Sequence, residues 1–475
     1  MDLTNCVLAS GLTRELSANG PLVVLVILSI TALFLALTLA AERLVETFLL
    51  WALFVVPFTA VVPALHPESQ NYAAYYAIAL FVFAAITILK RRQPPTIDIG
   101  VVFFSYLVCS WLLFAASAPL ARTYYPLIIP LTELAMYMLV INRPLARTEP
   151  ILLRGIVALG TVEALIGLSQ SLFGRPVFAQ VLPALWTSDR GYMGYLIPTV
   201  SKHVTQGSGT FEHFNGLGAL LVLSACVAFG DWLSHQRSLW RLSVFWAIFA
   251  GVVTTYSRGA LLGTFAGCVV VWWLSARRSS RHTVVAVLCA SAVGGVLASG
   301  ALLRYYSQTQ NLTSRLSTWS YAIRYVIHHP SSLLLGTGYS SFAKVILPAT
   351  TGQASGPLLV LHSGPLQVLL ELGIFGFALY LAMVLVPIAR SIYSPWSATR
   401  AVLIGATVGF LVAELFDNAT FGDPAISGPA GVVMFALIAL LRRDLIEASA
   451  EHGAYTKVRV AELQSAGKPN LTRSA

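Results

Sequence analysis

Thirteen long apolar runs constrain the fold of this 475-residue chain more than any other feature of its sequence. Hydrophobic residues make up 57% of the chain and charged residues only 11%, against roughly 25% charged residues in an average soluble domain. A run of about 17 to 25 apolar residues is long enough to cross a bilayer as a helix. Such runs occupy residues 21–40, 44–65, 72–89, 97–117, 123–141, 151–173, 214–233, 239–256, 258–274, 283–302, 365–389, 400–416 and 425–441.

The runs predict an all-α polytopic membrane protein with twelve or thirteen spans. The number is open because only residues 41–46 separate the first two runs, which also leaves open the side on which the N-terminus lies. A chain with so little polar surface is a poor fit to a soluble enzyme or a disordered protein. Its net charge of +10 is not arranged as a stripe of Lys and Arg interleaved with aromatic residues, so we expect no nucleic-acid partner.

The basic residues divide unevenly between the two predicted faces. Twenty of the 30 Lys and Arg residues fall on one face, which the positive-inside rule makes cytoplasmic together with the C-terminus. Ten fall on the outer face: Arg14, Arg122, Arg175, Arg190, Lys202, Arg258, Arg304, Arg315, Arg324 and Lys344.

Two outer segments are long, at about residues 174–213 and 303–361, whereas every inner loop is short. Long loops in a compact protein often carry function, and the second has the apolar spacing of helices. We therefore divide the chain into a membrane region at 1–302, a long outer helical loop at 303–361, C-terminal spans at 362–445 and a cytoplasmic tail at 446–475. Chemistry is expected on the outer face.

Arg258 is the most informative single position. It lies in the sequence Ser257-Arg258-Gly259, at the outer junction of two spans with almost no loop between them. A charge at such a place is costly unless it is paired or serves a site, although a long side chain can also extend to lipid headgroups. The nearby Gly259 and Gly263 allow close approach of another helix.

His362 stands directly before an apolar run and is a candidate general base. Ser363 is a suitable N-cap and Pro365 suits a first helical turn, so we expect His362 at a helix N-terminus, where the helix dipole disfavours an imidazolium. Ser363, Gln367 and Glu371 follow at intervals of four and share one face of that helix. A structural role is the alternative for a lone histidine at an interface.

The outer loop before His362 contains two arginines. Arg315 and Trp319 are one helical turn apart on one face, whereas Arg324 lies nine residues after Arg315, about half a revolution away. Both arginines therefore cannot face one small site from a straight helix, and we favour Arg315. The alternative is an amphipathic helix solvated on the membrane surface.

Other polar residues are weaker candidates. Glu212, His213 and Asn215 stand where the run from residue 214 begins, and Glu133 and Glu163 lie within apolar runs as possible partners for arginine. The sequence has no Asp-x-Asp pair and no cluster of His and carboxylates with metal-ligand spacing, so we expect neither a metal ion nor another cofactor.

Taken together, these segments resemble the O-antigen ligase family, which includes O-antigen polymerases and bacterial O-oligosaccharyltransferases. The resemblance covers about residues 150–445, and Phe214 stands where such sequences often have a proline. It rests on Gly209-Thr210-Phe211 to Asn215, on Ser257-Arg258-Gly259, on Arg315 to Trp319 followed by Gly336-Thr337-Gly338, and on the helix from His362 to Gly373-Ile374.

The resemblance implies a twelve-span membrane glycosyltransferase of the GT-C type in the bacterial inner membrane, with its active site facing the periplasm. It implies transfer of a glycan from undecaprenyl diphosphate to a sugar hydroxyl of lipid A-core, with inversion and without a metal ion. A diphosphate leaving group needs fixed positive charge, which Arg258 and Arg315 can supply, and His362 can take the acceptor proton. Arg324, Glu212, His213, Asn215, Trp319 and Gln367 are second-tier candidates.

Two alternatives remain at this stage. A polymerase or a protein O-oligosaccharyltransferase would use the same donor with another acceptor. A transporter of lipid-linked glycans would instead place polar residues at the membrane midplane in two related halves, whereas the polar features here gather on one face.

Overall fold

The computed structural model describes eleven stretches of the chain: residues 96–117, 125–173, 207, 209, 211, 214–235, 238–275, 310–342, 361–394, 397–416 and 430–450. Their secondary structure is helical throughout, with no strand among them. The helices are α5 (Ile99–Ser117), α6 (Tyr125–Ile141), α7 (Leu145–Phe173), α8 (Phe214–Ser234), α9 (Leu239–Thr255), α10 (Arg258–Ser275), α12 (Gln310–His328), α13 (Pro330–Leu335), α15 (Gly364–Tyr393), α16 (Ala398–Glu414) and a last helix at residues 430–450.

Nine of the thirteen expected spans fall wholly or largely on described residues, and all nine are helical. Within the described part, four helices are long and apolar enough to cross a membrane. The other four expected spans, at 21–40, 44–65, 72–89 and 283–302, lie outside the described residues, so the total of twelve or thirteen stays a prediction. The four helices cover Leu145–Leu172, Phe214–Ser234, Arg258–Ser275 and Gly364–Ile392.

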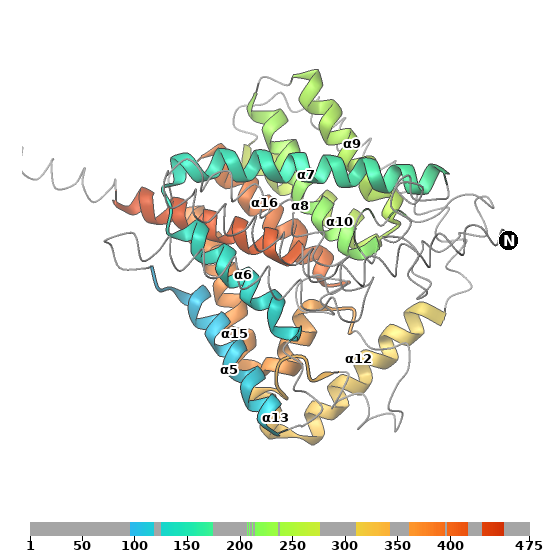
Figure 1. The fold of residues 1–475 in the computed structure, drawn as a ribbon, viewed down its shortest axis with the longest axis vertical. Coiled ribbons are helices and arrows are strands. Elements are labelled where there is room, and N and C mark those ends of the chain that lie inside the picture. Colours follow the sequence, from blue (N-terminus) through green and yellow to red (C-terminus); the bar gives the residue numbers. More distant parts are fainter. Residues whose placement is uncertain are drawn as a thin grey trace, which may run out of the picture.

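Apart from α6 and the last helix, the described helices form two sets (Figure 1). One set consists of α7, α8, α9, α10 and α16, which pack on one another in the upper part of the view. The other consists of α5, α12, α13 and α15 in the lower part, where α13 and α5 both pack on α15. The long outer loop expected at residues 303–361 thus contributes α12 and α13 to the second set.

Helix α7 begins at Leu145, six residues before the expected run at 151, and polar groups of its first turns have partners in other helices. The Leu145 backbone N–H donates to Glu447 Oε1 at 3.1 Å, and Thr399 Oγ1 donates to Glu149 at 2.5 Å. Glu447 belongs to the last helix, which continues through residue 450, past the boundary we placed at 445. These hydrogen bonds allow residues 145–150 to be helical, although their low hydropathy predicted a loop.

Ion pairs also hold this end of the bundle together. Arg400 Nε lies 2.5 Å from Asp444 Oδ2, and this pair is buried between α16 and the last helix. Arg443 pairs with Glu447 at 2.7 Å, one turn further along the same helix. Arg400, which we counted as an orientation signal, therefore also joins two helices.

Small residues line the contact between α10 and α16. A Cβ added at Gly263 would lie 2.4 Å from the Gly409 carbonyl oxygen, and one at Gly267 would lie 2.7 Å from that of Gly405. A Cβ at Gly259 would lie 3.0 Å from the Ala413 carbonyl oxygen, so the two helices run antiparallel. The close approach expected for Gly259 and Gly263 is confirmed. Close backbone packing of this kind stabilises helix pairs in a membrane, where the hydrophobic effect does not drive helices together.

Replacing Gly263 with leucine should lower the apparent melting temperature of the purified protein by several degrees. The added side chain meets backbone that cannot move aside, and overpacking of this kind typically costs about 1 to 3 kcal/mol. Leu262→Phe adds bulk to the exposed side of the same helix and is the matched control, with an expected change within about 0.5 kcal/mol. Equal melting of Gly263→Leu and the wild type would refute this account of the contact.

Candidate functional site

The turn between α9 and α10 places Arg258 at the first position of α10, where its side chain is exposed. The residue that ends α9, Tyr256, has left-handed backbone angles (φ 54°, ψ 17°), which few residues other than glycine adopt. This conformation turns the chain within two residues. Arg258 is thus held at a helix end without an intervening loop.

Hydrogen bonds fix this turn. Thr255 Oγ1 accepts from the Ser257 backbone N–H at 3.2 Å, and Ser257 Oγ accepts from the Ala260 N–H at 3.3 Å, as a helix N-cap does. The N-terminus of a helix carries partial positive charge, so a cation there does not help the helix itself. The same charge and the guanidinium would both attract an anion.

The segment before α8 lies against the same turn. The Gly207 N–H donates to the Thr254 carbonyl at 2.9 Å, and Gly209 exchanges two hydrogen bonds with the Gln170 side chain, at 2.7 and 2.8 Å. Gly209 has φ 62° and lies so close to Glu163 that an added Cβ would be 2.4 Å from its Oε2. This packing leaves room only for glycine.

Asn215 belongs to this first group of residues. It is buried at the second position of α8, one turn before Gly218, whose added Cβ would lie 2.9 Å from Ala260 Cβ. The structure therefore brings the starts of α8 and α10, with Asn215 and Arg258, to one place. Glu212 and His213 lie outside the described residues.

Tyr256 adds a neutral hydroxyl beside Arg258. Its hydroxyl hydrogen-bonds to Ser171 of α7. The hydroxyl stays protonated at physiological pH and would not repel an anion bound at this turn.

The second group of residues surrounds His362. Trp319 of α12 donates from its indole Nε1 to the Leu361 carbonyl at 3.4 Å, which ties α12 to the residue before His362. Below this bond is a small apolar core formed by Ala322, Val326, Phe342, Leu361 and Leu370, all buried. The structure therefore joins Trp319 and His362 in one unit, although 43 positions separate them in the sequence.

Helix α12 is continuous through both of its arginine positions. Position 315 is one turn before Trp319, and the Arg315 side chain lies outside the described residues. Arg324 is exposed, and its guanidinium carbon lies 5.7 Å from the centre of the Tyr321 ring, a cation–π distance. Trp319 is instead half-buried on the face that meets Leu361.

His362 itself is half-buried and has a left-handed backbone, with φ 30°. Ser363 occupies the N-cap position of α15 and Pro365 its first turn, as expected, although the Ser363 side chain makes no capping hydrogen bond. His362 therefore stands directly before a long helix, in a strained backbone conformation.

Glu371 has a role that we did not predict: it clamps the chain after α13 onto α15. Its carboxylate accepts from the Ser340 N–H at 2.9 Å and from the Phe342 N–H at 3.0 Å, and the Gln367 side chain also hydrogen-bonds to it. Gln367, which we considered for the site, is thus buried beside this clamp. Three acceptor contacts compensate the burial of the carboxylate.

A break in α15 makes the rest of this clamp. Gly373 has φ 69° and ψ −175°, which interrupts the helix and leaves carbonyls of the preceding turn available. The Thr337 N–H donates to the Leu370 carbonyl at 3.2 Å and the Gly338 N–H to that of Glu371 at 2.9 Å. Gly336-Thr337-Gly338 and Gly373 are the sequence signal for this contact, since glycine permits both the close approach and the break.

Two other acidic residues lie deep in the helices. Glu133 is fully buried on α6, and its carboxylate oxygens have no hydrogen-bond partner within the described part of the chain. An arginine partner for Glu133 therefore stays a prediction. Glu163, the other residue of that suggestion, packs against Gly209.

These features define a helical membrane protein whose polar residues gather at helix ends in two groups. Residues 242–381 match the family model described as O-antigen ligase, and this match confirms the family resemblance over that segment. The match supports a membrane enzyme of the O-antigen ligase or polymerase type, similar to a glycosyltransferase. No curated protein matches the chain. Arg258, Arg315 and His362 all lie within the matched residues.

Proposed function

We propose that this protein is an O-antigen ligase. It transfers a glycan from undecaprenyl diphosphate to a sugar hydroxyl of lipid A-core, with inversion at the anomeric carbon and without a metal ion. The acceptor oxygen attacks the anomeric carbon, the bond from that carbon to the diphosphate oxygen breaks, and undecaprenyl diphosphate leaves. The acceptor proton passes to a base on the protein.

Arg258 and Arg315 bind the diphosphate in this proposal. Negative charge grows on the leaving group as the glycosidic bond breaks, and fixed guanidinium groups stabilise it. Arg also pairs with phosphate oxygens through two parallel hydrogen bonds. The exposed position of Arg258 at the N-terminus of α10 supports this role, because the helix end and the side chain attract the same anion.

His362 takes the acceptor proton or positions the acceptor hydroxyl. Its place at the start of α15, beside the Trp319 contact, fixes the imidazole relative to α12. Asn215, Trp319 and Gln367 support the two groups through packing and hydrogen bonds. Arg324, Glu212 and His213 stay second-tier candidates in this proposal, and Glu212 and His213 lie outside the described residues.

One observation carries most of the weight. Among the described residues, only three other than glycine have a positive φ: Tyr256, Ser340 and His362. One is His362 itself, and another is two residues before Arg258. Strained backbone persists where surrounding structure imposes it and is common at active sites. The family match covers both positions independently.

We also propose that the site faces the periplasm and that the C-terminus is cytoplasmic, in the bacterial inner membrane. The uneven distribution of Lys and Arg supports this orientation. The twelve-span architecture of the GT-C type belongs to the same proposal.

The test is to identify the product of the purified protein. Labelled glycan on undecaprenyl diphosphate is supplied with lipid A-core, with a second lipid-linked glycan, or with a serine-containing protein acceptor, and products are analysed by mass spectrometry. We expect a new glycosidic bond on lipid A-core alone. The same rate in EDTA is expected, since fixed positive charge replaces a metal ion in this mechanism.

Each other outcome would replace part of the proposal. Extension of the lipid-linked glycan would identify a polymerase, and modification of the protein acceptor an O-oligosaccharyltransferase. Movement of labelled lipid across vesicles without a new bond would identify a transporter. Loss of transfer in EDTA would overturn metal independence.

A further inference from the structure

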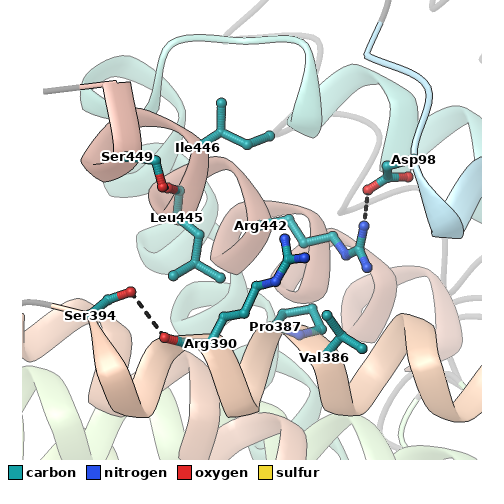
Figure 2. Close-up of a pocket in the computed structure, with 9 residues that line it drawn as sticks. All are labelled: Asp98, Val386, Pro387, Arg390, Ser394, Arg442, Leu445, Ile446 and Ser449. Carbon is teal, nitrogen blue, oxygen red and sulfur yellow. Dashed lines mark hydrogen bonds and ion pairs between the residues drawn. The ribbon is translucent and has the colours of Figure 1, made fainter. Parts of the chain in front are cut away.

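A pocket of about 650 Å³ lies where the C-terminal half of α15 meets the last helix and the start of α5. Figure 2 shows Arg390 and Arg442 with their guanidinium groups in this pocket. Arg390 is near the end of α15, roughly 40 Å of helix from Gly364 at a rise of about 1.5 Å per residue. The pocket is therefore at the opposite end of α15 from His362 and takes no part in the proposed transfer.

The charges in the pocket leave a net positive balance. Arg442 pairs with Asp98, as the dashed line in Figure 2 shows. Asp98 has other partners as well, because it accepts from the Tyr137 hydroxyl of α6 at 2.6 Å and from the Gly100 N–H at the start of α5 at 3.0 Å. One carboxylate thus faces two guanidinium groups, Arg390 and Arg442.

Both arginines have unused hydrogen-bond donors. The Arg390 side chain has no ion pair or hydrogen bond with any residue that the structure describes, and it points into the pocket. Arg442 Nε is buried and lacks a hydrogen-bond acceptor within the described part of the chain. A buried donor without an acceptor costs free energy, so an anionic ligand with several oxygen atoms would stabilise this arrangement.

The remaining wall is mostly apolar. Val386 and Pro387 of α15 and Leu445 and Ile446 of the last helix line it beside the arginines. Ile392, which lies between the pocket residues Arg390 and Ser394, is exposed. A ligand that fits both the two arginines and the apolar wall has an anionic headgroup and apolar chains.

We propose that this pocket binds the headgroup of an anionic phospholipid, with the phosphate between Arg390 and Arg442 and the acyl chains along α15. Basic pockets between membrane helices bind anionic headgroups in this way. A free phosphate ion shares the head chemistry but makes no use of the apolar wall. The lipid joins α15, the last helix and α5 at the end of the bundle distant from the proposed transfer site.

The experiment measures lipid binding to the full-length protein in a zwitterionic detergent, by native mass spectrometry and by the shift in melting temperature. The probes are phosphatidylglycerol, phosphatidylethanolamine and inorganic phosphate. We expect phosphatidylglycerol to bind the wild type and to bind Arg390→Gln about tenfold more weakly, since one charge-assisted hydrogen-bond donor is lost. Arg154→Gln removes an exposed arginine of α7 that does not line the pocket, and is expected to bind like the wild type.

Arg390→Gln should fold normally, because the side chain that it removes is exposed and makes no hydrogen bond or ion pair with other described residues. Equal binding of phosphatidylglycerol to Arg390→Gln and the wild type would overturn the proposal. So would equal binding of phosphatidylethanolamine, and a phosphate ion that binds as tightly as the lipid would reduce the pocket to a site for free anions. Because glycan transfer is not measured here, the result is independent of the proposed function.

Discussion

Arg258→Ala is expected to reduce the rate of glycan transfer by a factor of about 100 to 1,000 at matched protein amount. Loss of a single group that stabilises charge in a transition state typically has an effect of this size. Because the side chain is exposed at the end of α10, its removal should leave the melting temperature nearly unchanged. The measurement is the initial rate in a cell-free assay with purified donor and acceptor.

Arg258→Lys separates charge from geometry in this experiment. Lysine keeps the positive charge but cannot bind a diphosphate through two parallel hydrogen bonds, so we expect a rate between those of the wild type and the alanine variant. Arg154→Ala, at an exposed position of α7, controls for the loss of a surface arginine. Full activity in Arg258→Ala would remove Arg258 from the mechanism.

His362→Ala should lower kcat by about two to four orders of magnitude, the usual contribution of a general base, with a smaller change in KM. The structure offers an unusually clean companion variant, because His362 has φ 30° and glycine adopts such angles without strain. His362→Gly should therefore be at least as stable as the wild type and as inactive as the alanine variant. Melting curves and initial rates of both variants are the two measurements.

Activity of His362→Gly near the wild-type level would show that the imidazole only maintains the fold of this turn. His362→Gln distinguishes the two chemical roles, since glutamine can position a hydroxyl by hydrogen bonding but cannot accept its proton at neutral pH. A rate close to that of the wild type in His362→Gln would favour positioning over proton removal.

Much of the helical framework could be predicted from apolar run length alone. The start of α15 was also predictable, because Ser363 and Pro365 are typical of a helix N-terminus. The continuous helix α12 was predictable as well, and it places positions 315 and 319 one turn apart. These features depend on residues close together in the sequence.

Contacts between distant segments were not predictable from the same patterns. Glu371 looked like part of a polar stripe, yet its carboxylate accepts from backbone groups about 30 positions earlier. The early start of α7 depends on Glu447, 302 positions away. In both cases a polar group that we would expect to face solvent forms a hydrogen bond within the protein. The residues close to it in the sequence do not indicate which distant residue is its partner.

The clamp at Glu371 has a consequence for how this region can change during evolution. It recognises the N–H groups of Ser340 and Phe342, and α15 likewise accepts hydrogen bonds from the N–H groups of Thr337 and Gly338. Main-chain groups persist when a side chain is replaced, provided that the new residue is not proline. The outer surface beside His362 can therefore diversify through substitutions while the glycines and Glu371 keep its backbone in register. If the proposed ligase activity holds, such a division lets new acceptor preferences arise without redesign of the membrane helices.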